Sequence, residues 1–273
     1  MESAVRRLFR LLEPVHLVTY FADEPDEALL ALGYRNTWDC YFAGRAAPLG
    51  RVPAEVVHAI FYNFADGEVA RHIPRVWDIA TPQDALAARH RGCAAALRRI
   101  LGDLADTPAL ARAADVATKA ATSAPIEGRP LYAALRTVPV PAEPVARLYY
   151  AATLLREHRG DGHNAILVTE DIGGTEAHVL HALSEGIPAE KFGRIHHLPA
   201  ARLTAVVDGM RARGLIDASG WLSDAGRESK ERIESRTDDL AAPAYDSLTP
   251  SELDQFIADL EPISAALNAA GSR

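Results

Sequence analysis

The chain has 273 residues, of which 48% are hydrophobic and 24% are charged, and its formal net charge is −8. The size and composition suit a soluble globular protein with one large domain or two small ones. The acidic charge argues against a nucleic-acid binder, which needs a basic surface. No apolar run approaches the roughly 20 residues that span a bilayer. No secretory leader is recognised and the two cysteines have no metal or redox spacing, so we expect a cytoplasmic protein without a membrane partner.

The first half of the chain predicts helices throughout. Residues 13–21 and 23–50 carry apolar side chains at helical spacing. A compact helix over residues 53–64 opens with Pro53 in its first turn. A long one over residues 81–104 opens with Thr81 as N-cap and Pro82 after it. Residues 107–124 form a further helix, and we interpret residues 1–124 as an N-terminal helical half.

Residues 125–144 are interpreted as a connector between two halves, because prolines recur there. It is expected to be ordered, since Leu131, Tyr132 and Leu135 need burial. Residues 145–273 then form a C-terminal half. Its first helix is expected to stop at Gly160, and a new helix to start at His163. Helices at 173–186 and 198–214, a minimal hairpin at 215–226, and long helices at 224–245 and 249–270 complete it.

The order helix, helix, hairpin and long helix predicts a winged helix in an all-α protein with a minimal β-wing. A weaker signal suggests that the two halves are related. Residues 47–60 and 170–183 align without gaps, which pairs Gly50 with Gly173. Short helices rich in Ala, Val and Leu also match by chance, so duplication and coincidence both stay open. A true duplication would make the N-terminal half a degenerate winged-helix repeat.

Four segments carry a resemblance to a known family: "LEPVHLVTYF", "YFAGRAAPLG", "IEGRPLY" and "LREHRGDGHNAIL". Together they resemble an actinobacterial family of helix-turn-helix proteins that are distantly related to MarR-type regulators. The likeness runs over residues 5–267, and the "LREHRGDGH" block is its most distinctive part. It implies a MarR-like winged-helix scaffold with long helices from both chain ends, and it leaves the function open.

The wing departs from that of working MarR-type regulators, which is long and has an arginine near its tip. Here the segment 215–226 is short, has no arginine at its turn, and carries Asp217 and Asp224, which would face phosphates unfavourably. The candidate recognition segment 187–214 has five basic residues against two acidic ones. Nucleic acid is therefore an unlikely partner. If DNA is bound after all, Arg202 and Arg211 are the expected contacts.

One helical face in the first half is aromatic and ends in a guanidinium. Tyr34, Trp38, Phe42 and Arg45 recur at helical spacing. Such a stripe suits a pocket that stacks a planar or apolar body and clamps an anion. A core helix whose arginine snorkels or pairs with an acid explains the same pattern. On this observation alone the core interpretation is favoured.

The block "LREHRGDGH" admits a functional and a structural interpretation. Arg156 and Arg159 are three residues apart, so both can approach one carboxylate, sulfate or phosphate. Asp161 with His158 or His163 could form an acid–base pair. In the structural interpretation, Asp161 caps the following helix, and the arginines, Glu157 and Asp161 form a buried ion-pair network that joins the halves. The two interpretations stay equal at this point.

Glu127 and Arg129 lie in the connector, in the "IEGRPLY" segment. They could close over a pocket between the halves as further substrate-binding residues. Equally, Arg129 could simply hold the connector in place.

No metal and no cofactor are expected. His178 and His181 are three residues apart on a predicted helix, but no suitably spaced acid completes a ligand set. The chain contains no P-loop and no dinucleotide fingerprint that follows a strand.

These observations predict a small-molecule-binding protein on a scaffold that has lost DNA binding. It would act as an enzyme or enzyme subunit on a small anionic substrate in specialised metabolism. The alternative is a ligand-responsive transcriptional regulator that binds DNA through its helix-turn-helix. A third possibility is a partner protein whose terminal helices contact a second copy or a related chain.

Overall fold

The structure is a computed structural model that describes residues 3–191 and 197–271. The described residues are all-α, as expected. They contain one isolated antiparallel bridge, between Ile216 and Leu222, in place of the two-stranded hairpin expected there. The winged-helix form of the prediction therefore stays a proposal. Within the described ranges, no helix has the length and apolar character needed to cross a membrane.

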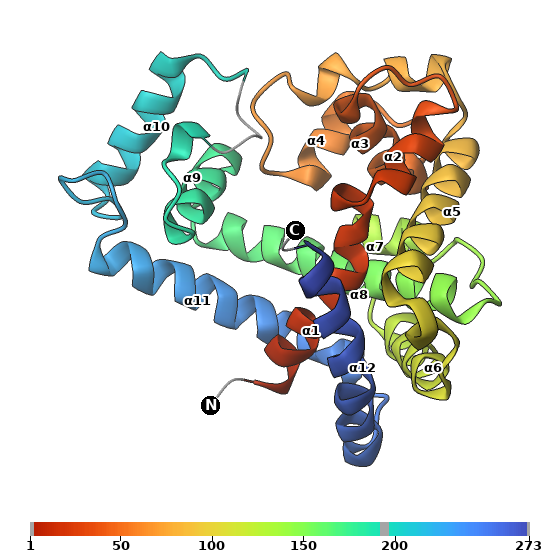
Figure 1. Ribbon diagram of the computed structural model, residues 1–273. Coiled ribbons are helices and arrows are strands. Elements are labelled where there is room, and N and C mark those ends of the chain that lie inside the picture. The colour runs from red at the N-terminus through yellow and green to blue at the C-terminus, as the bar shows by residue number, and fades with distance from the viewer. Residues whose placement is uncertain (1–2, 192–196, 272–273) are drawn as a thin grey trace.

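The N-terminal part of the chain forms a body of packed helices (Figure 1). Thr81 caps the long fifth helix by accepting a hydrogen bond from Asp84 N, as the sequence predicts. The helices are α1 (Ala4–Phe21), α2 (Asp23–Leu30), α3 (Thr37–Ala46), α4 (Ala54–Phe61), α5 (Pro82–Leu101), α6 (Pro108–Ser123) and α7 (Pro130–Leu135). The terminal helix α12 (Pro250–Gly271) returns to this body and packs on α1, α5 and α6. Both ends of the chain thus contribute to one apolar core.

Helix α8 (Pro144–Thr169) runs through the middle of the molecule (Figure 1) and packs on α1, α5, α6, α7 and α11. The expected helix stop at Gly160 is wrong, because α8 continues without a break through Gly160 and Gly162. A glycine ends a helix when it adopts a positive φ. Gly214, just after α10, does so with a φ of 77°, whereas neither glycine of α8 does. Packing on five neighbours outweighs the loss of about 0.5–1 kcal/mol per interior glycine.

The C-terminal part forms a smaller body of helices that we call the small lobe. It comprises the end of α8 together with α9 (Gly174–Ser184), α10 (Ala200–Ala212) and α11 (Asp224–Ala241). A second apolar cluster, which includes Leu167, Val179 and Ile233, holds it together. Helix α10 buries only Met210 and is otherwise largely exposed. Helix α11 ends at Ala241 instead of continuing to 245, and Ala242–Tyr245 forms a 3-10 turn.

The two apolar clusters divide the chain unevenly. The larger one takes side chains from residues 8–155 and 244–267, and the smaller one from residues 166–233. The proposed halves, residues 1–124 and 145–273 with their connector, and the proposed duplication remain predictions. Between the body and the small lobe, α8 and α11 supply the charged side chains described next.

Candidate functional site

A cleft of about 630 Å³ lies between α1 and α4 on one side and α8, α9 and α11 on the other. We call it the central cleft. Its volume falls within the range of small-molecule pockets. From α8 it is lined by Arg156, Gly160, His163 and Leu167. These residues recur every three or four positions, so one face of the helix forms its wall.

A buried ion triad forms the inner end of the central cleft. The Glu157 side chain is 3% exposed and lies between two guanidinium groups. Arg45 Nη2 is 3.1 Å from Glu157 Oε2, and Arg156 Nη1 is 3.1 Å from Oε1. Burial alone would raise the pKa of Glu157, but Arg45 and Arg156 hold it below its usual value. The Arg45 guanidinium also donates to Tyr41 Oη at 2.9 Å and stacks 4.2 Å above the Phe61 ring.

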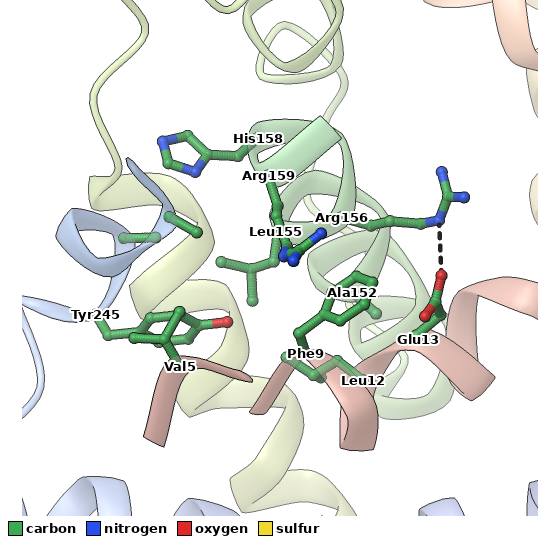
Figure 2. A pocket seen from close by; sticks show the side chains of 12 residues that line it. Val5, Phe9, Leu12, Glu13, Ala152, Leu155, Arg156, His158, Arg159 and Tyr245 are labelled. Atoms are coloured by element: carbon green, nitrogen blue, oxygen red, sulfur yellow. Dashed lines mark ion pairs between the residues drawn. The ribbon is translucent and has the colours of Figure 1, made fainter. Parts of the chain in front are cut away.

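Arg156 also faces α1 (Figure 2), where its Nε lies 3.7 Å from Glu13 Oε1. Burial raises the pKa of Glu13, although Arg156 and Arg159 oppose that shift. A small cavity of about 10 Å³ lies beside these groups. Figure 2 shows the side chains that line it, among them His158 and Tyr245. That volume suits a single water molecule. The larger central cleft is therefore the candidate site.

Arg159 turns the other way, toward α11. Its Nη2 lies 2.7 Å from Glu234 Oε2 and 3.0 Å from Asp238 Oδ1. Its guanidinium stacks 4.1 Å from the Phe9 ring centre, as Figure 2 illustrates. Arg156 and Arg159 therefore do not converge on one anion as the functional interpretation expected. Arg156 instead shares Glu157 with Arg45, and Arg159 joins α8 to α11.

Asp161 caps helix α7, which precedes it in the chain, and not the following helix that the structural interpretation expected. Its Oδ2 accepts hydrogen bonds from the backbone N–H groups of Leu131 and Tyr132, both at 3.0 Å, at the start of α7. Burial raises its pKa to about 7, although these two N–H groups oppose the shift. Among the hydrogen bonds of the described residues, none joins Asp161 to His158 or His163. The expected acid–base pair is not assembled.

The two histidines lie in different surroundings. His158 is buried, with its ring 5.0 Å from that of Tyr132. His163 lines the central cleft, and its Nδ1 lies 3.0 Å from Thr237 Oγ1. Burial lowers the pKa of each imidazole to about 4, with a contribution from Arg129 at His158. Both are therefore neutral at physiological pH.

Arg129 holds the connector in place. Its Nη1 donates to His158 O at 2.6 Å and its Nη2 to Leu240 O at 2.7 Å, which ties the connector to α8 and α11. The guanidinium crosses α8 so closely that a Cβ on Gly162 would overlap Nη1 and lie 3.0 Å from Cζ. Glu127 is exposed and does not line the central cleft. The connector therefore does not close over the site.

The aromatic stripe belongs mainly to the core. Tyr34 precedes α3, which begins at Thr37, so it is not on the same helix as Trp38 and Phe42. Phe42 is fully buried and Tyr34 is 3% exposed, and neither they nor Trp38 line the central cleft. Of this set only Arg45 reaches it. The core interpretation of the stripe matches the structure.

Several residues at the site were not among the candidates named from the sequence. Glu13 of α1, Phe61 of α4 and Glu234 and Thr237 of α11 are far from "LREHRGDGH" in the chain, so no local pattern could have found them. Glu157 was accessible to sequence reasoning, because it stands between two arginines in the motif itself.

The candidate DNA contacts are paired with acids. Arg202 Nη2 lies 3.3 Å from Asp66, in the loop after α4, and Arg211 Nη1 lies 2.5 Å from Asp208. All four side chains are exposed, so each pair is worth no more than about 1 kcal/mol. Residues 192–196 of the candidate recognition segment lie outside the described residues. Within the ranges described, no group of three His, Cys, Asp or Glu side chains is arranged to hold a metal ion.

Comparison with known proteins gives one informative result. A family model described as a helix-turn-helix family matches residues 5–273, nearly the whole chain. No curated protein and no solved structure matches the chain.

Proposed function

Because the chain belongs to this helix-turn-helix family, we propose that it is a helix-turn-helix protein whose central cleft binds a small molecule with an anionic group. The same proposal includes a MarR-like scaffold and an actinobacterial origin. It also includes a role in specialised metabolism as an enzyme or enzyme subunit. A dimer formed through the terminal helices with a second copy or a related chain is a further part. The geometry of the central cleft supports the ligand-binding part of this proposal.

The supporting observation is the excess of buried positive charge at the inner end of the central cleft. Arg45 and Arg156 share the single carboxylate of Glu157. Arg89 lies behind them and is 2% exposed, and its hydrogen bonds go to Tyr149 Oη and Gly44 O, which carry no formal charge. The Glu13 carboxylate, 3.7 Å from Arg156 Nε, offsets one of these charges, so the three guanidinium groups exceed the two carboxylates by one positive charge. An anion here would be stabilised strongly, because screening is weak at low local dielectric.

Apolar side chains of the central cleft suit an apolar ligand body. Its lining includes Ile60 and Phe61 from α4, Leu167 from α8 and Leu180 from α9. Nearer the mouth, Lys230 pairs with Glu234, which also accepts from Arg159. These mouth charges are therefore already balanced. The combination favours an acid with an apolar chain or ring.

Calorimetric titration of the full chain tests this proposal. Octanoate should bind at physiological salt, and octylamine, which has the opposite charge on the same chain, should not. Gly160→Leu should weaken octanoate binding at least about tenfold, since a Cβ there meets only Glu157 Oε2 at 3.5 Å and the added side chain fills the cleft. Gly209→Leu is the matched control, because a Cβ on this exposed residue of α10 meets nothing within 4 Å. Equal binding of acid and amine, or unchanged binding in Gly160→Leu, would contradict the proposal.

The regulator alternative draws on one observation. Helices α9 and α11 of the small lobe both line the central cleft, so an occupant would contact this lobe directly. The net charge of −8 favours the version without DNA.

A further inference from the structure

His163 gives the central cleft a second polar anchor. It follows Arg156 by seven residues on the cleft-facing side of α8, which places the two Cα atoms about 10.5 Å apart along the helix axis. Gly160 lies between them and has no side chain to interrupt the wall. A ligand held by its acid at Arg45 and Arg156 would therefore extend along α8 toward His163.

The hydrogen bond to Thr237 fixes which ring nitrogen of His163 carries the hydrogen. Thr237 is fully buried, and its hydroxyl donates to Ile233 O at 2.7 Å. With its only hydrogen committed, Thr237 Oγ1 can only accept from His163 Nδ1, 3.0 Å away. Nδ1 is then the protonated nitrogen, and Nε2 keeps its lone pair.

The groups around the ring keep it neutral. Burial is the main cause of its lowered pKa, and Lys230 of α11, Arg159 of α8 and His181 of α9 add to it, against the opposing charge of Glu234. In the neutral ring, Nε2 is a hydrogen-bond acceptor. Arg159 and Lys230 both pair with Glu234, so they already have an acceptor of their own.

We propose that the ligand of the central cleft is an acid that carries a hydrogen-bond donor, such as a hydroxyl, at its far end, and that His163 Nε2 accepts this hydrogen. The inference rests on the proposed function, because Arg45 and Arg156 must hold the acid end. His163 is then the residue that selects hydroxy acids from simple acids of equal length. A long apolar acid that lacks a hydrogen-bond donor would leave Nε2 without a hydrogen-bond partner.

A matched ligand set tests the specificity. ω-Hydroxyoctanoate should bind the full chain about tenfold more tightly than ω-methoxyoctanoate, which keeps the oxygen but lacks the hydrogen. His163→Phe should bind both with equal affinity. If the natural chain binds both acids equally, or if His163→Phe still prefers the hydroxy acid, the role of His163 is overturned. Either result would leave the anion site intact. If neither these acids nor octanoate bind, the proposed function fails with it.

A ligand-free measurement tests the tautomer independently. Nitrogen-15 NMR of the full chain at neutral pH should show a protonated Nδ1 and an unprotonated Nε2 for His163. Thr237→Val should abolish this preference, because valine has no oxygen to accept from Nδ1. A hydrogen on Nε2 in the natural chain would refute the assignment, whatever ligand is later found.

Discussion

Replacing Gly162 with alanine tests why two glycines stand inside α8. The Arg129 guanidinium crosses the helix at Gly162, and a Cβ there would overlap Nη1 and lie 3.0 Å from Cζ. Arg129 must then move and give up its hydrogen bonds to His158 O and Leu240 O. At Gly160 the nearest atom to a Cβ is Glu157 Oε2, at 3.5 Å, an ordinary contact. The same substitution should therefore have opposite effects two residues apart.

The magnitude follows from those contacts. Two hydrogen bonds from a charged group contribute about 1.5–3 kcal/mol each, and alanine inside a helix regains about 0.5–1 kcal/mol over glycine. Gly162→Ala should thus lower the free energy of unfolding by roughly 2–5 kcal/mol. For a chain of this size the Tm should fall by about 5–15 °C. Gly160→Ala should leave the Tm unchanged or raise it slightly.

Thermal and urea unfolding of both variants measure the difference. In an Arg129→Ala background, Gly162→Ala should no longer destabilise the protein, because the group that it displaces is gone. A Gly162→Ala protein as stable as the natural chain would refute this explanation. So would an equal loss of stability with and without Arg129.

Three further predictions concern pH and DNA. Burial raises the pKa of Asp161 from 3.8 to about 7, so the folded state holds a proton that the unfolded state releases. Stability should therefore fall as pH rises from about 4 to 7, and urea titrations should show a smaller fall in Asp161→Asn. The pKa of His163 is lowered from 6.5 to about 4, so its effect on stability has the opposite sign to that of Asp161. The free energy of unfolding should decrease as pH falls from about 6.5 to 4, and it should decrease less in His163→Phe. The net charge of −8 and the acids Asp217 and Asp224 of the short wing segment oppose phosphate binding, so the protein should not retard its own promoter DNA at physiological salt. Salt-sensitive retardation that is lost in an Arg202→Ala, Arg211→Ala double variant would favour the regulator instead.

The helical class and most helix starts could be predicted because they depend on local signals. Thr81 and Pro82 open α5 as expected, and α4, α6 and α9 to α12 begin within two residues of the predicted positions. The start of α1 at Ala4 and the division of residues 23–50 into α2 and α3 were not predicted. The break at Gly160 was wrong because local propensity disfavours glycine in a helix, whereas packing against several helices decides the outcome. That packing involves residues far away in the chain, such as those of α1 and α11.

The candidate site could be predicted only in part, for the same reason. Arg45, Arg156 and His163 do line one cleft, although nothing in their spacing indicated that Glu157 joins the two arginines. Asp161 was assigned to acid–base chemistry or to a cap of the following helix, whereas it caps α7, 30 residues earlier in the chain. Tyr34 and Trp38 showed a helical spacing that also describes a packed core, and the spacing alone could not separate the two.

The location of a bound acid is the most direct test of the proposed binding function. A crystal of the full chain soaked with ω-bromooctanoate would place the carboxylate from electron density and the bromine from its anomalous signal. We expect the carboxylate within hydrogen-bonding distance of Arg45 or Arg156 and the bromine near His163. Bromine in the apolar groove that Leu17, Phe21 and Leu267 line between α1, α5 and α12, with no carboxylate in the central cleft, would contradict the proposal.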